Sequence, residues 1–164
     1  MSKAFISLMV VLGAWAPLPR AFSAETGTVL GSAKMIGKAP ERSDLNMKSD
    51  PFCAKVGAVK DEDIVASAGG QLKNVAVRIS KGLTGTFPAP AEAATLDQNG
   101  CMYRPRVIVA QAGQPVQIKT SDQTLHNVHT YKGPATLFNQ AQPQGFPPIK
   151  KKFPTVGDVI KFKC

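Results

Sequence analysis

The fold prediction rests on residues 106–131, which read RVIVAQAGQPVQIKTSDQTLHNVHTY. Residues 106–122 contain two short runs of strand-forming residues on either side of Gly113, and a similar run returns in residues 125–131. Aliphatic and β-branched residues bounded by glycine, proline and small polar residues are typical of β-strands joined by tight turns. This stretch therefore predicts successive strands of an antiparallel sheet.

Strand signals continue outward from this stretch in both directions. Further strands are predicted at residues 26–40, on both sides of Gly31, at residues 63–82, on both sides of the Gly69-Gly70 turn, and at residues 156–164. In the second strand of the 63–82 segment, Val75, Val77 and Ile79 would share one face, because side chains alternate along a strand.

Helical signals are weak by comparison. One helical turn is predicted at residues 90–96, and proline-rich loops are predicted at residues 86–92 and 141–149. No long stretch has a period of 3.6 residues, and turn signals recur about every eight to twelve residues. The pattern predicts an all-β fold, an antiparallel Greek-key β-sandwich.

Residues 1–23 predict a signal peptide. Lys3 precedes an apolar run, and Ala21 and Ser23 supply the small residues of a cleavage site. The apolar run is short for a membrane span, and no later stretch reaches about 18 apolar residues. We therefore expect a periplasmic or secreted protein with no membrane span, whose mature domain covers residues 24–164.

The chain is basic, with 20 Lys and Arg against 11 Asp and Glu and a formal net charge of +9. Loss of Lys3 and Arg20 with the signal peptide lowers this charge by two, to +7. The excess could serve solubility, or it could meet a redox partner protein with an acidic surface. The basic residues are scattered, apart from Lys150-Lys151-Lys152, and lack interleaved aromatic residues, so nucleic-acid binding is not expected.

The chain has three cysteines, Cys53, Cys101 and Cys164. In an oxidising compartment two of them can pair, and one is left as a free or functional thiol. Cys53 follows Asp-Pro-Phe and Cys101 follows Gln-Asn-Gly, which are both turn-like surroundings, so we expect these two to be bonded. Closing a loop of about 48 residues would stabilise the folded state by about 4 kcal/mol.

Two stretches, GQPVQIKTSDQTLHNV (113–128) and GDVIKFKC (157–164), resemble the cupredoxins, the small blue-copper β-sandwich proteins. In that family the first copper ligand is a His in a pattern such as N-x-D-x-x-x-H-N-V, and here Thr120 stands where Asn is common. The second ligand is a Cys that ends a strand. Three more stretches match an exported bacterial group with a cupredoxin-like domain and extend the resemblance over residues 27–164: DPFC (50–53), GQLKNVAVR (70–78) and QNGCMYRP (98–105).

The resemblance implies a copper site with His126 and Cys164 as ligands. A blue-copper site uses two imidazoles and one thiolate with a weak axial thioether. The resemblance also implies that Asn127 ties the strand of His126 to the Cys loop and tunes the thiolate. His129 is the candidate for the second imidazole, but residues 126 and 129 point to opposite faces of an extended strand. It could reach the metal only through a turn or bulge, and is otherwise a surface histidine.

The chain departs from the family pattern at its last residue. In cupredoxins a second His and a Met follow the Cys within a few residues, whereas nothing follows Cys164. We therefore expect an incomplete copper site and a sandwich whose final strand is missing, as in a fragment of a longer protein.

The expected function is that of an extracytoplasmic mononuclear copper protein, which transfers electrons or carries copper. The alternative is a metal-free β-sandwich that serves as a binding or structural module of the cell envelope. An enzyme is not expected, because copper enzymes of this kind need a further histidine cluster and the chain has only two histidines. A Cys–His nucleophile would also need a supported pocket beside its base. The oligomeric state is left open.

Overall fold

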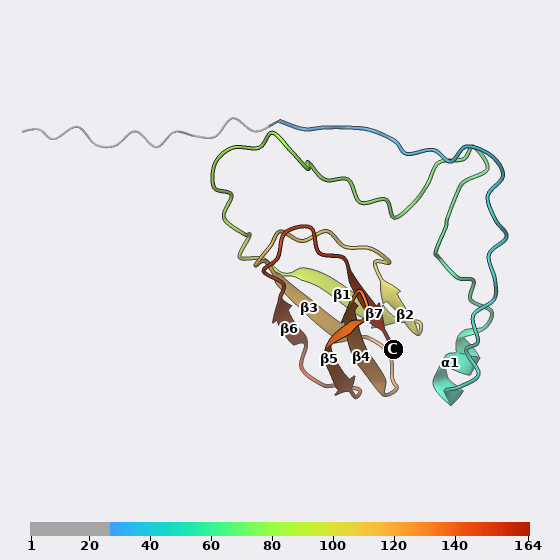
Figure 1. Cartoon of the computed structure of the whole chain (residues 1–164). Helices are drawn as coiled ribbons and strands as arrows, with labels where there is room; N and C mark the ends of the chain where they lie inside the picture. The colour runs from blue at the N-terminus through green and yellow to red at the C-terminus, as the bar shows by residue number, and fades with distance from the viewer. Residues whose placement is uncertain (1–26) are drawn as a thin grey trace, which may run out of the picture. The chain divides into compact units, whose positions relative to one another are not determined.

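The computed structural model describes residues 27–164, so the predicted signal peptide lies outside the described residues (Figure 1). The elements are α1 (Pro51–Val56), β1 (Ala94–Asn99), β2 (Met102–Arg104), β3 (Pro115–Thr120), β4 (His126–Lys132), β5 (Ala135–Gln142), β6 (Ile149–Lys152) and β7 (Ile160–Lys163). All of them belong to one compact unit, residues 32–164. Within the described residues the regular structure is β apart from the six-residue α1, which confirms the all-β prediction. No helix of this part of the chain has the length and apolar character to cross a membrane.

The strands form two sheets in a sandwich-like arrangement (Figure 1). One sheet has the order β2-β1-β3-β6 and the other the order β5-β4-β7. Four of the five strand pairs are antiparallel, whereas β1 and β3 are parallel. The parallel pair departs from the purely antiparallel prediction. It arises because β2 runs back toward the start of β1, and residues 105–114 then carry the chain across to the other side of β1.

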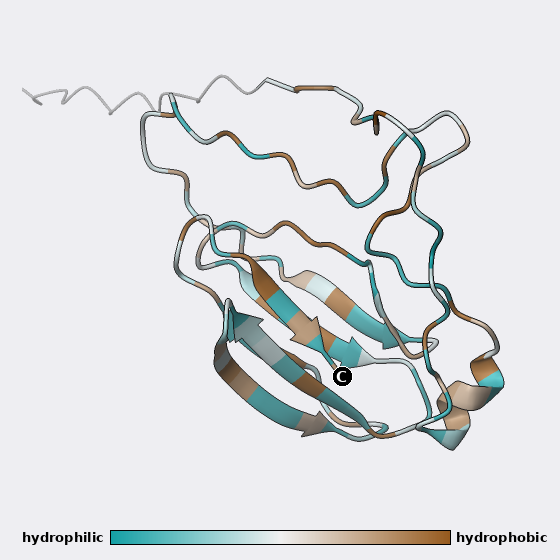
Figure 2. Cartoon of the chain, turned by 45° about the vertical axis from the view of Figure 1, so that its right-hand side comes forward, coloured by the Kyte–Doolittle hydropathy of each residue, from teal (hydrophilic) through white to brown (hydrophobic). Residues whose placement is uncertain are grey.

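The hydrophobic core lies between the two sheets and is small. Its buried apolar side chains are Leu96, Val116, Ile118, Val128 and Ile149, and the partly buried side chains packed against them are Tyr103, Ile108, Phe138, Phe153 and Phe162. Buried and more exposed residues alternate along β3 and β4, as expected for strands with one face toward a core. Figure 2 shows bands of hydrophobic and hydrophilic residues along the strands.

A pair of buried glutamines links the two sheets. Gln98 in β1 donates from Nε2 to Oε1 of Gln142 in β5, at 2.7 Å, and Gln142 donates from Nε2 to the carbonyl oxygen of Ile118 in β3, at 2.9 Å. Both glutamines are almost completely buried. Buried amides are costly unless they are hydrogen-bonded, so these two bonds help to fix the position of β5 over β1 and β3.

The strands predicted at residues 26–40 and 63–82 are not formed. The described parts of these segments contain only isolated bridges, which join Lys34 to Gln71 and Ala66 to Leu72. The predicted face of Val75, Val77 and Ile79 is exposed, to 82% in the case of Val77. Alternation of apolar and polar residues was therefore not sufficient, because a strand also needs a neighbour that pairs with its backbone groups.

Predictions closer to the sheets were partly right. The strands predicted within 106–122, 125–131 and 156–164 are confirmed by β3, β4 and β7, respectively. The first run of the 106–122 segment is not a strand, and the helical turn predicted at residues 90–96 is wrong because β1 begins there. Both β5 and β6 overlap the predicted loop at residues 141–149. Pairing with distant strands outweighed local preference at these positions.

The N-terminal part of the described chain contributes nothing to the core, because none of residues 27–95 is buried. The disulfide between Cys53 in α1 and Cys101 in the β1–β2 turn confirms the predicted pair and ties this part to the sheets. A second link is the hydrogen bond from Thr124 Oγ1 to Asp50 Oδ2, at 3.0 Å. Asp50 is also the N-cap of α1, where Oδ1 accepts two backbone N–H groups of the first turn.

Replacement of the fully buried Ile118 by Ala should lower the free energy of unfolding by about 2–5 kcal/mol, because it leaves a cavity between the sheets. Ile79→Ala removes the same atoms from an exposed side chain and should change the free energy by less than about 0.5 kcal/mol. Chemical denaturation of both variants measures the two differences. Equal losses would contradict the location of the core between the two sheets.

Replacement of both Cys53 and Cys101 by Ser should lower the free energy of unfolding by up to about 4 kcal/mol. The two cysteines are 48 positions apart, and without the cross-link the segment between them regains conformational freedom in the unfolded chain. Replacing both cysteines avoids leaving one of them as a new free thiol. Denaturation without and with a reducing agent provides the measurement, since reduction should destabilise the wild type and leave the double variant unchanged. A double variant as stable as the wild type would show that the cross-link does not stabilise the fold.

Candidate metal centre

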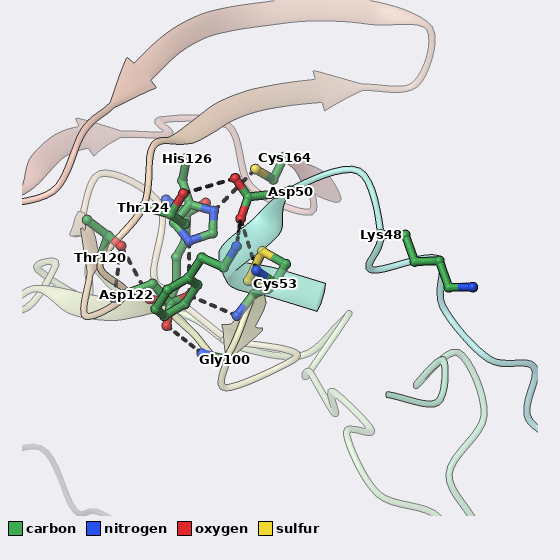
Figure 3. The surroundings of a disulfide bond; sticks show 12 residues. Lys48, Asp50, Cys53, Gly100, Thr120, Asp122, Thr124, His126 and Cys164 are labelled. Carbon is green, nitrogen blue, oxygen red and sulfur yellow. Dashed lines mark hydrogen bonds and ion pairs between the residues drawn. A yellow bond between two sulfur atoms is a disulfide. The ribbon is translucent and has the colours of Figure 1, made fainter. Parts of the chain in front are cut away.

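The two predicted ligands meet at the ends of neighbouring strands. His126 is the first residue of β4, and Cys164 directly follows β7, which pairs antiparallel with β4. His126 Nδ1 lies 3.4 Å from Cys164 Sγ (Figure 3). The imidazole is buried, with 4% of its surface exposed, whereas Cys164 is exposed. A free thiol thus faces a buried imidazole at the edge of the sandwich.

The sulfur of Cys164 has a second contact, because the backbone N–H of Asn127 donates to Sγ at 3.3 Å. The side-chain amide of Asn127 donates instead to Asn139 Oδ1 in β5, at 2.6 Å. The backbone of Asn127 therefore ties the strand of His126 to Cys164, and its side chain ties β4 to β5. An N–H group that donates to sulfur favours the thiolate over the thiol.

The contact between the imidazole and the sulfur shifts the pKa of both groups. The hydrogen bond with Cys164 raises the pKa of His126; burial opposes this shift, and Asp122 adds to it. The hydrogen bond with His126 lowers the pKa of the Cys164 thiol; burial opposes this shift, and the Asn127 N–H adds to it. Both shifts favour an imidazolium beside a thiolate. The thiolate is the form of cysteine that binds metal ions, and the imidazole can bind the same ion once it has lost its proton.

A carboxylate from the N-terminal part of the chain lies beside this pair. Asp50 accepts a hydrogen bond from Thr124, two residues before His126 and 74 residues away from Asp50 in sequence (Figure 3). The backbone N–H of Cys53 is the main cause that lowers the pKa of Asp50, which favours its charged form. That negative charge opposes the ionisation of Cys164.

Asp122 lies on the opposite side of the imidazole. Its Oδ2 is 2.9 Å from His126 Nε2, and both side chains are buried (Figure 3). Its two oxygens also accept the backbone N–H groups of Gly100 and Cys101, at 2.7 and 2.8 Å. The two ring nitrogens of His126 therefore have different partners, a carboxylate at Nε2 and a sulfur at Nδ1.

Cys101, Asp122 and His126 form a group that could hold a metal ion, since their candidate ligand atoms lie within 4.8 Å of one another. The sulfur of Cys101 is bonded to Cys53, however, and a disulfide sulfur is not the thiolate that metal ions bind. Cys164 is the one free cysteine of the three, and it faces the other ring nitrogen. The chemistry of the two sulfurs therefore favours Nδ1 of His126 and Sγ of Cys164 as the donor pair.

His129 lies on the outer face of β4, whereas His126 lies on its buried face. The His129 ring stacks on Tyr131 with 4.1 Å between ring centroids, Nδ1 lies 2.7 Å from the Tyr131 hydroxyl, and Nε2 lies 3.0 Å from Thr136 Oγ1. The strand bulges only after Thr130, so no irregularity turns His129 toward Cys164. The structure thus brings His126 and Cys164 together and leaves His129 with other partners.

Two residues of the site, Tyr103 and Asp122, had no role in the sequence prediction. Tyr103 in β2 donates from its hydroxyl to the carbonyl oxygen of Lys163, at 3.2 Å, and lies 3.4 Å from that of Asn127. Burial is the main cause that raises the pKa of Tyr103. Asp122 contacts Nε2 of His126. Both residues stand inside the quoted motifs, QNGCMYRP and the N-x-D pattern, but the sequence alone did not show what either side chain contacts.

Comparison of this chain with protein-family models, curated proteins and solved structures finds no match. The residues and distances of the site are therefore the evidence from which a function can be inferred. Its most specific feature is the pairing of a free thiol with a buried imidazole at the ends of β4 and β7.

Replacement of His126 by Gln should raise the pKa of the Cys164 thiol toward the ordinary value of about 8.5, because the imidazole is the main cause that lowers it. The rate of alkylation by iodoacetamide as a function of pH, followed by mass spectrometry with the disulfide intact, provides the measurement. The wild type should reach half of its maximal rate at a lower pH than the variant. His129→Gln is the matched control and should leave this midpoint unchanged. Identical midpoints in the wild type and H126Q would refute the contact.

Proposed function

We propose that this chain is an exported mononuclear copper-binding protein of the cupredoxin type, with an incomplete type 1 copper site, which transfers electrons or carries copper. The observation that carries the proposal is the separation of 3.4 Å between His126 Nδ1 and Cys164 Sγ, two residues 38 positions apart. These are the two residues that the cupredoxin resemblance names as ligands. The proposal includes a Greek-key arrangement of the sandwich, and the β-rich, two-sheet architecture supports it.

The chemistry of the two donors fits copper. Thiolate sulfur is a soft ligand and imidazole suits copper among other ions, so the pair favours copper over magnesium or calcium. Metal–nitrogen and metal–sulfur bonds are about 2.0 and 2.3 Å long in protein sites, so two atoms 3.4 Å apart can bind one ion. The N–H of Asn127 and the carboxylate of Asp122 support the sulfur and the imidazole from outside the donor pair.

Bound copper would supply one-electron chemistry, and the residues of this chain would hold it at the edge of the sandwich. The formal net charge of +7 that remains after the loss of Lys3 and Arg20 with residues 1–23 favours a redox partner with an acidic surface. We place the protein in the periplasm or outside the cell, on the basis of the signal-peptide pattern in residues 1–23.

Addition of Cu(II) to the metal-free protein, with Cys164 reduced and the disulfide intact, should produce an intense visible absorption from charge transfer between thiolate and copper. Cys164→Ser should abolish this band, because the serine oxygen is not a soft thiolate donor. His126→Gln should weaken or abolish it, since the imidazole is the second donor of the pair. Absorption spectroscopy with stoichiometric copper provides the measurement.

His129→Gln is the matched control for this experiment, because it removes the other histidine of the chain. It should retain the band, since the ring nitrogens of His129 contact Tyr131 and Thr136. A wild type that shows no thiolate-to-copper band would refute copper binding by this chain. The same test on the gene extended past Cys164 would then separate two explanations. A band there would indicate a copper site that lacks some of its ligands in this chain, and no band there would favour the metal-free binding or structural module of the cell envelope.

A further inference from the structure

Asp122 lies in the connection between β3 and β4, where a tight turn of the neighbouring hairpin holds it in place. Gly100 and Cys101 form this turn between β1 and β2, with φ values of 64° and 58°. Left-handed conformations at both central residues are typical of two-residue hairpin turns. The N–H groups of both residues donate to Asp122, one to each carboxylate oxygen. Figure 3 labels Gly100 and Asp122.

The turn is itself fixed by two independent constraints. Asn99 and Met102 pair across the hairpin on either side of it. Cys101 is bonded to Cys53. The position of the Asp122 carboxylate is therefore set by a strand pair and a cross-link, so it can act as a fixed acceptor for a neighbouring side chain.

That neighbour is the imidazole of His126, whose Nε2 lies 2.9 Å from Asp122 Oδ2. Both side chains are more than nine-tenths buried, with relative exposures of 7% for Asp122 and 4% for His126. Asp122 Oδ2 already accepts the backbone N–H of Cys101, and a carboxylate oxygen can only accept hydrogen bonds. Its hydrogen bond with His126 therefore requires the hydrogen to be on Nε2. In the neutral ring the lone pair then lies on Nδ1, the atom that faces Cys164.

We propose that Asp122 is a positioning residue, which selects the Nε2-protonated tautomer of His126 and orients Nδ1 toward Cys164. This inference rests on the proposed function, because Nδ1 is the atom that would bind the metal ion. Hydrogen-bond partners commonly fix the tautomer and orientation of histidines that bind metals. A carboxylate that only stabilised the hairpin turn would not determine which nitrogen of His126 carries the hydrogen.

Nitrogen-15 NMR of the imidazole, recorded on metal-free protein, tests this inference directly. Cys164→Ser provides the background, so that no thiolate competes for the ring hydrogen. At a pH where the ring is neutral, the protein with Asp122 should show mainly the Nε2-protonated tautomer. Asp122→Asn brings an N–H donor to Nε2, and the population ratio of Nε2-protonated to Nδ1-protonated ring should fall by at least about tenfold.

Asp97→Asn is the matched control, because it makes the same substitution in β1, the strand that leads into the turn of Gly100 and Cys101. Asp97 contacts Ser121 and Lys119, and the substitution should leave the tautomer ratio of His126 unchanged. A mainly Nδ1-protonated ring in the protein with Asp122 would overturn the proposal, as would an unchanged ratio in D122N. The first of these outcomes needs no Asp122 variant, so it decides the matter even if D122N does not fold.

Copper affinity in the chain that retains Cys164 separates this inference from the proposed function. D122N should bind Cu(II) about 10–100-fold more weakly than the wild type, and D97N should bind it equally well. Equal affinity of D122N and the wild type would overturn the positioning role. A changed tautomer ratio in D122N, combined with no copper binding by the wild type, would support the positioning role and refute the copper site.

Discussion

The antiparallel pairing of β4 with β7 is the constraint on which the site depends. It places Phe162 opposite Thr130 on the buried face, where Phe162 packs edge-to-face with Tyr103 and Phe153. A shift of one residue would turn Phe162 to solvent and bring lysines into the core, so burial of this side chain fixes the register. With the register fixed, Cys164 reaches the end of the sandwich where β4 begins with His126.

The same end of the sandwich collects buried polar groups that could not be tolerated without partners. His126 and Asp122 are both buried, and each is satisfied by the other and by neighbouring backbone or sulfur atoms. The hydroxyl of Tyr103 reaches across from the other sheet to the carbonyl oxygen of Lys163. A polar cluster satisfied in this way holds its members in one arrangement, and this arrangement gives the two nitrogens of His126 different chemical roles.

The N-terminal part of the described chain is attached to the sheets by specific links rather than by a shared core. Ion pairs join Arg104 to Glu62 and Arg106 to Asp63, but pairs between exposed side chains contribute about 0–1 kcal/mol each. The disulfide and the hydrogen bond from Thr124 to Asp50 are the more consequential links. They attach this part of the chain beside the site, so Asp50 joins a site whose other residues come from the same part of the sequence as the core.

The sequence by itself determined the all-β class, the disulfide pair, and the strands that contain Val116 and His126, because these depend on alternation, turn residues and the local surroundings of the cysteines. It also predicted opposite faces for His126 and His129, since side chains alternate along a strand. Only the tertiary structure decided that Val77 lies outside any sheet and that Asp122 meets the imidazole. The reason is that alternation is local, whereas backbone pairing and the hydrogen bonds of buried groups depend on segments far apart in the chain.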